Sequence, residues 1–231
     1  MLGYFDYTVW LTYMSLLSAG LGIMVTLNGN GHPYLGIFFL LFCGLCDAFD
    51  GRVARTKEGR TEREKKFGIQ IDSLSDLVAF GVLPACIGNA MIRVSPSIKD
   101  VPELHNSKPT DITTAILLFT IMLFYILAAL IRLAYFNVME EERQQKEDGV
   151  RKHFQGLPVT SAALIFPTVL LFQFILPADI TPVYFAVMIV TAILFVLNVR
   201  IPKPGIRGIL ILIGLGMAEF VAFAIAWFSH R

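Results

Sequence analysis

The sequence predicts an all-α protein, a bundle of helices that cross a membrane. Of the 231 residues, 55% are hydrophobic and 16% are charged, and the mean hydropathy is +0.66. Soluble domains are about 25% charged. The charged residues are also confined to a few segments, with long apolar runs between them. Both observations indicate a polytopic integral membrane protein.

Seven apolar runs reach or approach the length of about 20 residues that a helix needs to cross a bilayer. The fifth and sixth runs are separated only by Pro177-Ala178-Asp179-Ile180, which predicts a tight helical hairpin. The predicted spans are residues 7–27, 34–51, 69–92, 112–136, 159–177, 181–198 and 207–228.

The basic residues predict the orientation of these spans. If the N-terminus is cytoplasmic, 15 of the 19 Lys and Arg residues fall on the cytoplasmic side and four on the other. Cytoplasmic loops of membrane proteins carry such an excess of Lys and Arg. We therefore expect a cytoplasmic N-terminus, and a cytoplasmic loop between the second and third spans, where seven of the basic residues lie.

Four aspartates flank this basic loop. Asp47 and Asp50 close the second predicted span, and Asp72 and Asp76 open the third. Residues three or four apart share one face of a helix. A short connection makes the two helices antiparallel neighbours, so we expect the four carboxylates to converge.

Carboxylates gathered near lipid repel one another and need a counter-charge. Oxygen ligands suit Mg²⁺ and Mn²⁺, and a pair of such ions suits a displacement at phosphorus. The alternative is that each aspartate is a helix cap or a salt-bridge partner of a nearby basic residue. That alternative explains the four together poorly, since Asp47 lies inside an apolar run.

Small residues accompany the aspartates. Gly51 follows Asp50 directly, Ala54 lies one turn further on, and Gly68 precedes the third aspartate by four residues. Small side chains leave room for a flat or phosphorylated ligand. Arg55, one turn after Gly51, could meet a phosphate as a bidentate donor.

These residues resemble the signature of the CDP-alcohol phosphatidyltransferases, D-x-x-D-G-x-x-A-R followed by G-x-x-x-D-x-x-x-D. All eight fixed positions of this pattern match. The gap between the two halves is longer than is usual, with twelve residues between Arg55 and Gly68. The matching residues are Asp47, Asp50, Gly51, Ala54, Arg55, Gly68, Asp72 and Asp76.

Further segments are similar to the phosphatidylserine synthase branch of that family. They read DGRVAR at 50–55, DSLSDLVAFGVLPA at 72–85, RLAYFN at 132–137 and FQGLP at 154–158. Where that branch often has Arg, this chain has Tyr135. The similarity is strong over residues 43–86 and 131–163 and hardly extends to the C-terminal spans.

The resemblance implies one integral membrane domain over residues 1–231, with six core helices and one or two more, working as a homodimer at the cytoplasmic membrane. It implies transfer of a phosphatidyl group from CDP-diacylglycerol to L-serine, with CMP released, and Asp76 as general base. Two divalent ions, Mg²⁺ or Mn²⁺, would assist. Their ligands would be Asp47, Asp50, Asp72 and Asp76, and the CDP-lipid pocket would be lined by Gly51, Ala54, Arg55 and Gly68.

The acceptor site is less clearly marked. The carboxylate of serine needs a cation, for which Arg132, Lys152 and His153 are candidates, with Asn137 as a neutral donor. Membrane anchoring is the alternative for Arg132 and Lys152, and capping of a helix end is the alternative for Asn137. Glycerol 3-phosphate or inositol phosphate remains open as the acceptor.

A different class of protein, an ion-coupled transporter, also places carboxylates in helix bundles, but near the midplane of the membrane. Here the carboxylates gather at one face beside a basic loop, which favours an enzyme. Glu219, in the last apolar run, receives no role from the sequence.

Overall fold

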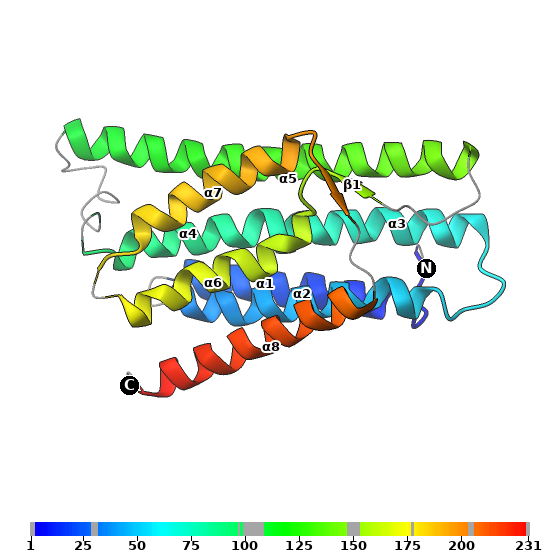
Figure 1. The fold of residues 1–231 in the computed structure, drawn as a ribbon, viewed down its shortest axis with the longest axis horizontal. Helices are drawn as coiled ribbons and strands as arrows, with labels where there is room; N and C mark the ends of the chain where they lie inside the picture. Colours follow the sequence, from blue (N-terminus) through cyan, green and yellow to red (C-terminus); the bar gives the residue numbers. More distant parts are fainter. Residues whose placement is uncertain are drawn as a thin grey trace.

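The computed structural model describes residues 3–28, 32–96, 98, 109–146, 153–176, 178–202 and 206–229. These residues form helices that lie roughly side by side (Figure 1). The elements are α1 (Trp10–Leu27), α2 (Pro33–Ala54), α3 (Glu62–Asp76), the π-helical segment η1 (Leu77–Val82), α4 (Leu83–Val94), α5 (Pro109–Lys146), β1 (His153–Gln155), the 3-10 turn η2 (Val159–Ser161), α6 (Ala162–Ile175), α7 (Thr181–Val196), β2 (Arg200–Pro202) and α8 (Ile206–Ser229).

The predicted fold class is confirmed. Because α3, η1 and α4 run on without a break, the described helices form seven rods, one for each predicted span. Four rods are long and apolar enough to cross a membrane, and α6, α7 and most of α8 are shorter apolar helices. The chain is a polytopic integral membrane protein.

Two rods extend beyond the predicted spans at the same end of the bundle. The third begins at Glu62 rather than at residue 69, because Thr61 and Glu64 form a capping box: the Glu64 N–H donates to the Thr61 hydroxyl at 3.2 Å, and the Thr61 N–H donates to the Glu64 carboxylate at 2.7 Å. Asp72 and Asp76 therefore lie well inside this rod and do not open it, which corrects the prediction.

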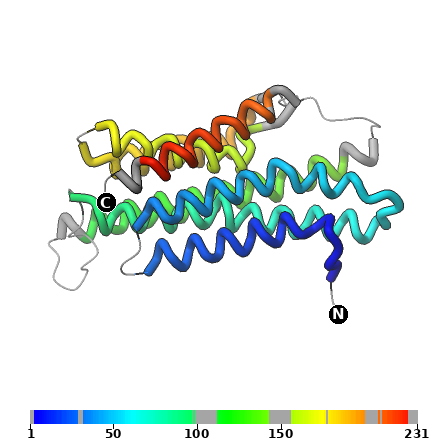
Figure 2. Tube along the Cα trace, turned by 90° about the horizontal axis from the view of Figure 1, so that it is seen from below, coloured from blue at the N-terminus to red at the C-terminus, as the bar shows by residue number. Residues whose placement is uncertain are grey.

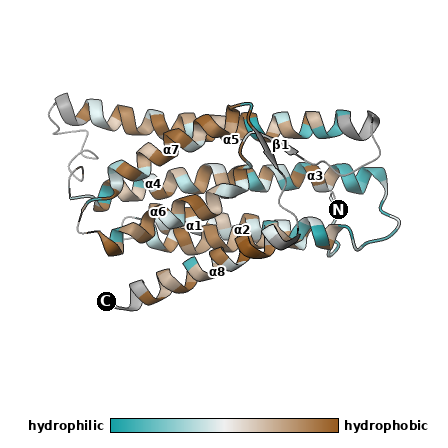
Figure 3. Ribbon diagram, viewed as in Figure 1, coloured by the Kyte–Doolittle hydropathy of each residue, from teal (hydrophilic) through white to brown (hydrophobic). Residues whose placement is uncertain are grey.

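The other long rod is α5. Its 38 residues rise by about 57 Å, which exceeds the roughly 30 Å hydrocarbon core of a bilayer. Hydrophilic residues gather on the α3 half of the third rod and on the neighbouring end of α5, whereas the middle of the bundle is hydrophobic (Figure 3). These two helices thus form a polar end that projects out of the membrane.

The π-helical segment η1 follows Asp76 directly. Pro84, two residues after this segment, has no N–H and cannot donate to the carbonyl of Phe80 one turn earlier. The hydroxyl of Tyr125, on α5, donates to that carbonyl at 2.6 Å instead. A buried carbonyl is thus satisfied from a neighbouring helix, and the widened turn is stable.

Helices α6 and α7 form the antiparallel hairpin predicted from their short connection (Figure 1). The pair β1–β2 was not predicted. The two strands are antiparallel, with His153 opposite Pro202 and Gln155 opposite Arg200, and they join the α5–α6 connection to the α7–α8 connection.

Helix α6 packs closely on α2. A Cβ atom at Gly44 would lie 2.6 Å from the Cβ atom of Ala163, so only glycine allows this approach. Helix α8 contacts both α2 and α6. It lies on the opposite side of the bundle from α1 (Figure 2). Both α6 and α8 therefore pack against α2, the helix that carries the first two aspartates.

Candidate active site

Three of the four predicted aspartates meet between α2 and α3. Asp47 and Asp50 come from α2 and Asp72 comes from α3, and each offers one carboxylate oxygen within 4.8 Å of the others. All three side chains are half-buried. The convergence follows from the helical spacing and from the short connection between the two helices.

This group fits a divalent metal ion. Oxygen Oδ1 of Asp72 is buried and has no hydrogen-bond partner among the described residues. A buried anionic oxygen left without a partner is costly, and coordination to a hard cation removes that cost. Asp47, Asp50 and Asp72 are therefore the residues that could hold such an ion.

Asp76 stands apart from the three. It is 8% exposed and is not part of the group whose oxygens lie within 4.8 Å of one another. It lies one helical turn beyond Asp72 and immediately before η1. The family resemblance implies that Asp76 is both a metal ligand and the general base, and in the structure it lies outside the group formed by the other three aspartates.

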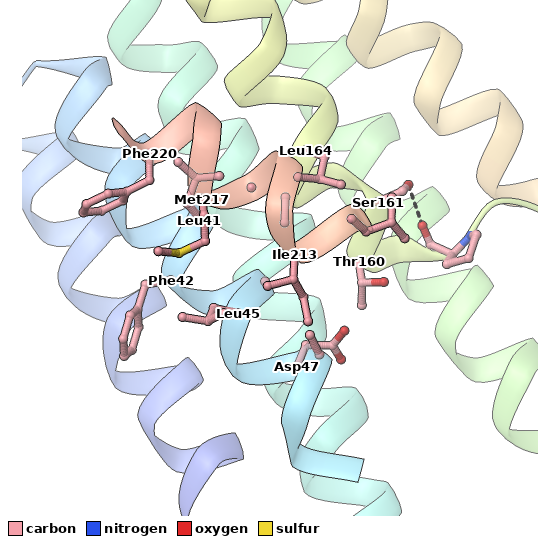
Figure 4. A pocket seen from close by; sticks show the side chains of 16 residues that line it. Leu41, Phe42, Leu45, Asp47, Thr160, Ser161, Leu164, Ile213, Met217 and Phe220 are labelled. Atoms are coloured by element: carbon pink, nitrogen blue, oxygen red, sulfur yellow. Dashed lines mark hydrogen bonds between the residues drawn. The ribbon is translucent and has the colours of Figure 1, made fainter. Parts of the chain in front are cut away.

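A cavity of about 570 Å³ opens beside the aspartates, between α2, α6 and α8. Its walls are mainly apolar, and Asp47 lies at one end of it while Met217 and Phe220 lie towards the other (Figure 4). Thr160 and Ser161 supply hydroxyl groups to the lining. One compartment thus joins a carboxylate group to an apolar space, which suits an amphiphilic ligand.

The small residues of the motif lie where α2 ends and α3 begins. Arg55 is exposed, and its guanidinium is 3.5 Å from the position that a Cβ atom of Gly51 would take. Gly68 has a different neighbour, because the position of its missing Cβ atom is 2.9 Å from Nη2 of Arg60. Arg60 belongs to the long connection and was not among the predicted site residues.

The predicted acceptor residues occupy different surroundings. Arg132 is 5% exposed and donates from Nε to the carbonyl of Leu157 at 3.0 Å and from Nη2 to that of Gly156 at 3.4 Å. Asn137 donates to the hydroxyl of Ser73 at 2.7 Å. Asn137 therefore lies beside the helix that carries Asp72. Lys152 lies outside the described residues, and only the backbone of His153 is described, in β1.

Ion pairs fasten the connection between α2 and α3. Lys57 Nζ lies 2.6 Å from an oxygen of Asp6 and 2.7 Å from an oxygen of Glu64. Hydrogen bonds from Lys57 and from Thr8 lower the pKa of Asp6 to about 2. The connection is thereby tied both to the segment before α1 and to the first turn of α3.

Several residues of the site were missed from the sequence. Ser73, Thr160 and Ser161 are ordinary small polar residues, and no local pattern marks them as neighbours of the aspartates. Arg60 could have been noticed from the sequence, because it lies in the connection between Arg55 and Gly68, whose length departs from the family pattern.

Comparison with known proteins identifies the family of the chain and the reactions named for its relatives. The family model for CDP-alcohol phosphatidyltransferase matches residues 7–220. No solved structure matches the chain significantly.

Among curated proteins, CDP-diacylglycerol–serine O-phosphatidyltransferase of Saccharomyces cerevisiae is 34% identical over 143 residues, which cover 61% of this chain and 43% of that protein. The protein of the same name from Helicobacter pylori is 25% identical over 187 residues, covering 79% of this chain and 67% of the relative. Archaetidylserine synthase of Methanothermobacter thermautotrophicus is 28% identical over 191 residues, covering 82% and 68%. The chain thus spans less than half of the yeast protein and about two thirds of the other two.

Proposed function

Because the chain belongs to the CDP-alcohol phosphatidyltransferase family, we propose that it transfers a phosphatidyl group from CDP-diacylglycerol to L-serine, giving phosphatidylserine and CMP. The serine acceptor is supported by the names of its relatives, which include two serine O-phosphatidyltransferases and an archaetidylserine synthase. The single observation that carries the proposal is the apolar cavity that ends at Asp47, within the group of three aspartates.

The donor is an amphiphile, and the site has two matching parts. The acyl chains of the lipid fit the apolar environment of α2, α6 and α8, and the diphosphate fits the polar end at the aspartates. Asp47, Asp50 and Asp72, with Asp76 as a further ligand, would hold two ions, Mg²⁺ or Mn²⁺. Such ions neutralise the charge of the diphosphate and of the departing CMP. Gly51, Ala54 and Gly68 leave room for the nucleotide, and Arg55 meets a phosphate.

The reaction is a displacement at phosphorus. Asp76 accepts the proton of the serine hydroxyl, and the serine oxygen forms a bond to the phosphorus of the phosphatidyl group. The bond between that phosphorus and the oxygen of CMP breaks, so CMP leaves with the bonding electrons. The buried position of Asp76, one turn away from the group of three, suits a residue that handles a proton at the edge of a metal site.

The polar end of α3 and α5 belongs at the cytoplasmic face in this proposal, with the N-terminus in the cytoplasm. The distribution of Lys and Arg supports it. A homodimer is part of the same proposal, and the molar mass of the protein in detergent, by light scattering, tests it.

The decisive experiment is an assay of purified protein in detergent with CDP-diacylglycerol and labelled serine, glycerol 3-phosphate or inositol phosphate in parallel. We expect lipid-phase label from serine, with an equal amount of CMP, and loss of both when a chelator removes Mg²⁺ and Mn²⁺. Label from another acceptor would retain the metal chemistry and overturn the serine assignment. Absence of CMP release with every acceptor would overturn the transferase.

Asn137 offers a test of the acceptor site. It lies beside Asp72 through Ser73, whereas Arg132 is engaged with backbone carbonyls. We expect Asn137→Ala to raise the KM for serine roughly tenfold, as loss of a hydrogen bond to a charged substrate does, and to leave the KM for the donor unchanged. Gln70→Ala, an exposed amide on α3, is the matched control and should change neither. An equal rise in both KM values would remove Asn137 from the acceptor site.

A further inference from the structure

Arg60 occupies a defined position on the connection between α2 and α3. Its connection is fixed at several points: Gly59 turns the chain with φ +70°, Thr61 caps α3, and Lys57 bridges Asp6 and Glu64. A side chain held on such a connection has a preferred direction. That direction is given by the contacts of the guanidinium.

The guanidinium spans the gap between α2 and α3. Nη1 donates to the carbonyl of Ala54 at 3.2 Å, and Nη2 donates to the carbonyl of Glu64 at 3.3 Å. Nη2 also lies 2.9 Å from the position of a Cβ atom on Gly68. Ala54 and Gly68 are the small residues to which the family resemblance assigns the nucleotide pocket.

The same contacts place Arg60 close along both helices to the residues of the aspartate group. Ala54 lies seven residues after Asp47, which puts both on one face of α2, and Gly68 lies four residues before Asp72, on one face of α3. A charged group between Ala54 and Gly68 is therefore one or two helical turns from the carboxylates.

Arg60 is not saturated by its present partners. Both acceptors are neutral carbonyls, and Nε is buried without a hydrogen-bond partner among the described residues. No carboxylate within the described ranges forms a salt bridge with it, although Lys57, Lys65 and Lys66 all have one. A guanidinium and a phosphate are both ionised, and the planar fork of the guanidinium allows two parallel hydrogen bonds, which makes phosphate a better partner than two separate neutral carbonyls.

We propose that Arg60 is a donor-binding residue, which contacts the diphosphate of the CDP-linked lipid from the longer α2–α3 connection. The inference rests on the proposed function and adds to it a cation from outside the family motif. When the donor binds, the guanidinium exchanges neutral carbonyls for phosphate oxygens, and Nε gains an acceptor. Arg55 and Arg60 then approach the diphosphate from the two motif glycines, Gly51 and Gly68.

The competing explanation is that Arg60 only fastens the connection, by capping the last carbonyls of α2. That role uses Nη1, which donates to the carbonyl of Ala54 at the end of α2, while Nη2 ties the connection to the carbonyl of Glu64 in α3, and it leaves Nε unexplained. It also predicts that any change that loosens the connection has the same effect as removing the guanidinium.

The test measures binding of CDP with Mg²⁺ to the purified full chain by calorimetry, without an acceptor. The test variants are Arg60→Ala and Arg60→Lys. One control is Thr61→Ala, which breaks the capping box and keeps Arg60, and the other is Arg63→Ala, which removes an exposed arginine one turn away. We expect Arg60→Ala to weaken CDP binding roughly tenfold to hundredfold, Arg60→Lys to recover part of it, and the other two variants to change it less than about threefold.

A second ligand separates the phosphate contact from a general loss of order. Binding of cytidine, which has no phosphate, should be the same in Arg60→Ala and in the wild type. The proposal is overturned if Arg60→Ala binds CDP as the wild type does, if Thr61→Ala reproduces its defect, or if cytidine binding falls equally. Because no acceptor is present, a wild type that uses an acceptor other than serine leaves this result intact, so failure of the proposed function is recognised separately.

Discussion

The helices of this protein hold acidic side chains in two different settings. At the α2–α3 end, Asp47, Asp50 and Asp72 lie within 4.8 Å of one another, and one oxygen of Asp72 is buried without a partner. On α8, Glu219 lies among apolar residues. Its Oε1 pairs with the hydroxyl of Thr168 on α6, and its Oε2 is also buried without a partner among the described residues. The first setting concentrates negative charge, and the second has a single neutral partner.

The partners show what each setting can do. The hydroxyl of Thr168 also contacts the carbonyl of Leu164 at 2.7 Å, and its single proton can serve only one of these two acceptors. A carboxyl group that carries its own proton completes the pair, so Glu219 suits a neutral clasp between α6 and α8. Three carboxyl groups in contact need a cation instead. We therefore expect a structural role for the acid on α8 and a chemical role for the group at the α2–α3 end.

The largest expected effect is at the aspartate group. We expect Asp72→Asn to reduce turnover by about hundredfold or more, because it removes charge from the place where the diphosphate is stabilised. The same variant should bind Mn²⁺ more weakly, which electron paramagnetic resonance measures directly. Glu62→Gln, an exposed acid on the same helix, is the control and should behave as the wild type. Normal Mn²⁺ binding in Asp72→Asn would remove Asp72 from the metal site.

Asp76 tests whether an acid that is buried beside the aspartate group, but is not part of it, also takes part in the reaction. We expect Asp76→Asn to lower turnover by roughly 10²- to 10⁴-fold, as loss of a general base does, and to retain binding of CDP with Mg²⁺. The assay of phosphatidyl transfer and calorimetry with CDP together check this. Unchanged turnover would sink the assignment of Asp76 as the base.

Glu219 should give the smallest effect. We expect Glu219→Gln to keep activity within about twofold of the wild type, because an amide can still pair with Thr168. We expect Glu219→Leu to lower the free energy of unfolding by roughly 0.6 kcal/mol, which is typical of one interhelical hydrogen bond in a membrane. Thermal denaturation in detergent measures the second effect, and Thr168→Val should match it. A large loss of turnover in Glu219→Gln would show that this residue takes part in the reaction, and Glu219 would then no longer differ in role from the aspartate group.

The sequence predicted the parts of the fold that depend on local pattern. Apolar runs bounded by polar or proline-containing connections gave one helix each, and the spacing of Asp47, Asp50 and Asp72 was sufficient to bring them together. Thr61 and Glu64 also indicate in the sequence where α3 starts. Hydropathy alone does not detect this start, because the capping box is made of polar residues.

Other features depend on partners distant in the sequence. The effect of Pro84 on its helix is decided by Tyr125, which satisfies the carbonyl that proline leaves free. Strands of three residues are too short for their periodicity to be recognised, and the pairing of β1 with β2 is decided by the connections that they join. Which helices enclose the cavity beside Asp47 follows from the packing of α6 and α8 on α2, and no single segment encodes it.

Because α8 is the last of the described helices, its wall of the cavity is synthesised last. A ribosome makes the chain from the N-terminus, so the aspartates of α2 and α3 enter the membrane long before Ile213, Met217 and Phe220 are made. Until α8 arrives, the compartment beside Asp47 lacks one wall and opens to the surrounding lipid. The nascent chain therefore contains the aspartates first, and the α8 wall of the cavity is added when translation reaches that helix.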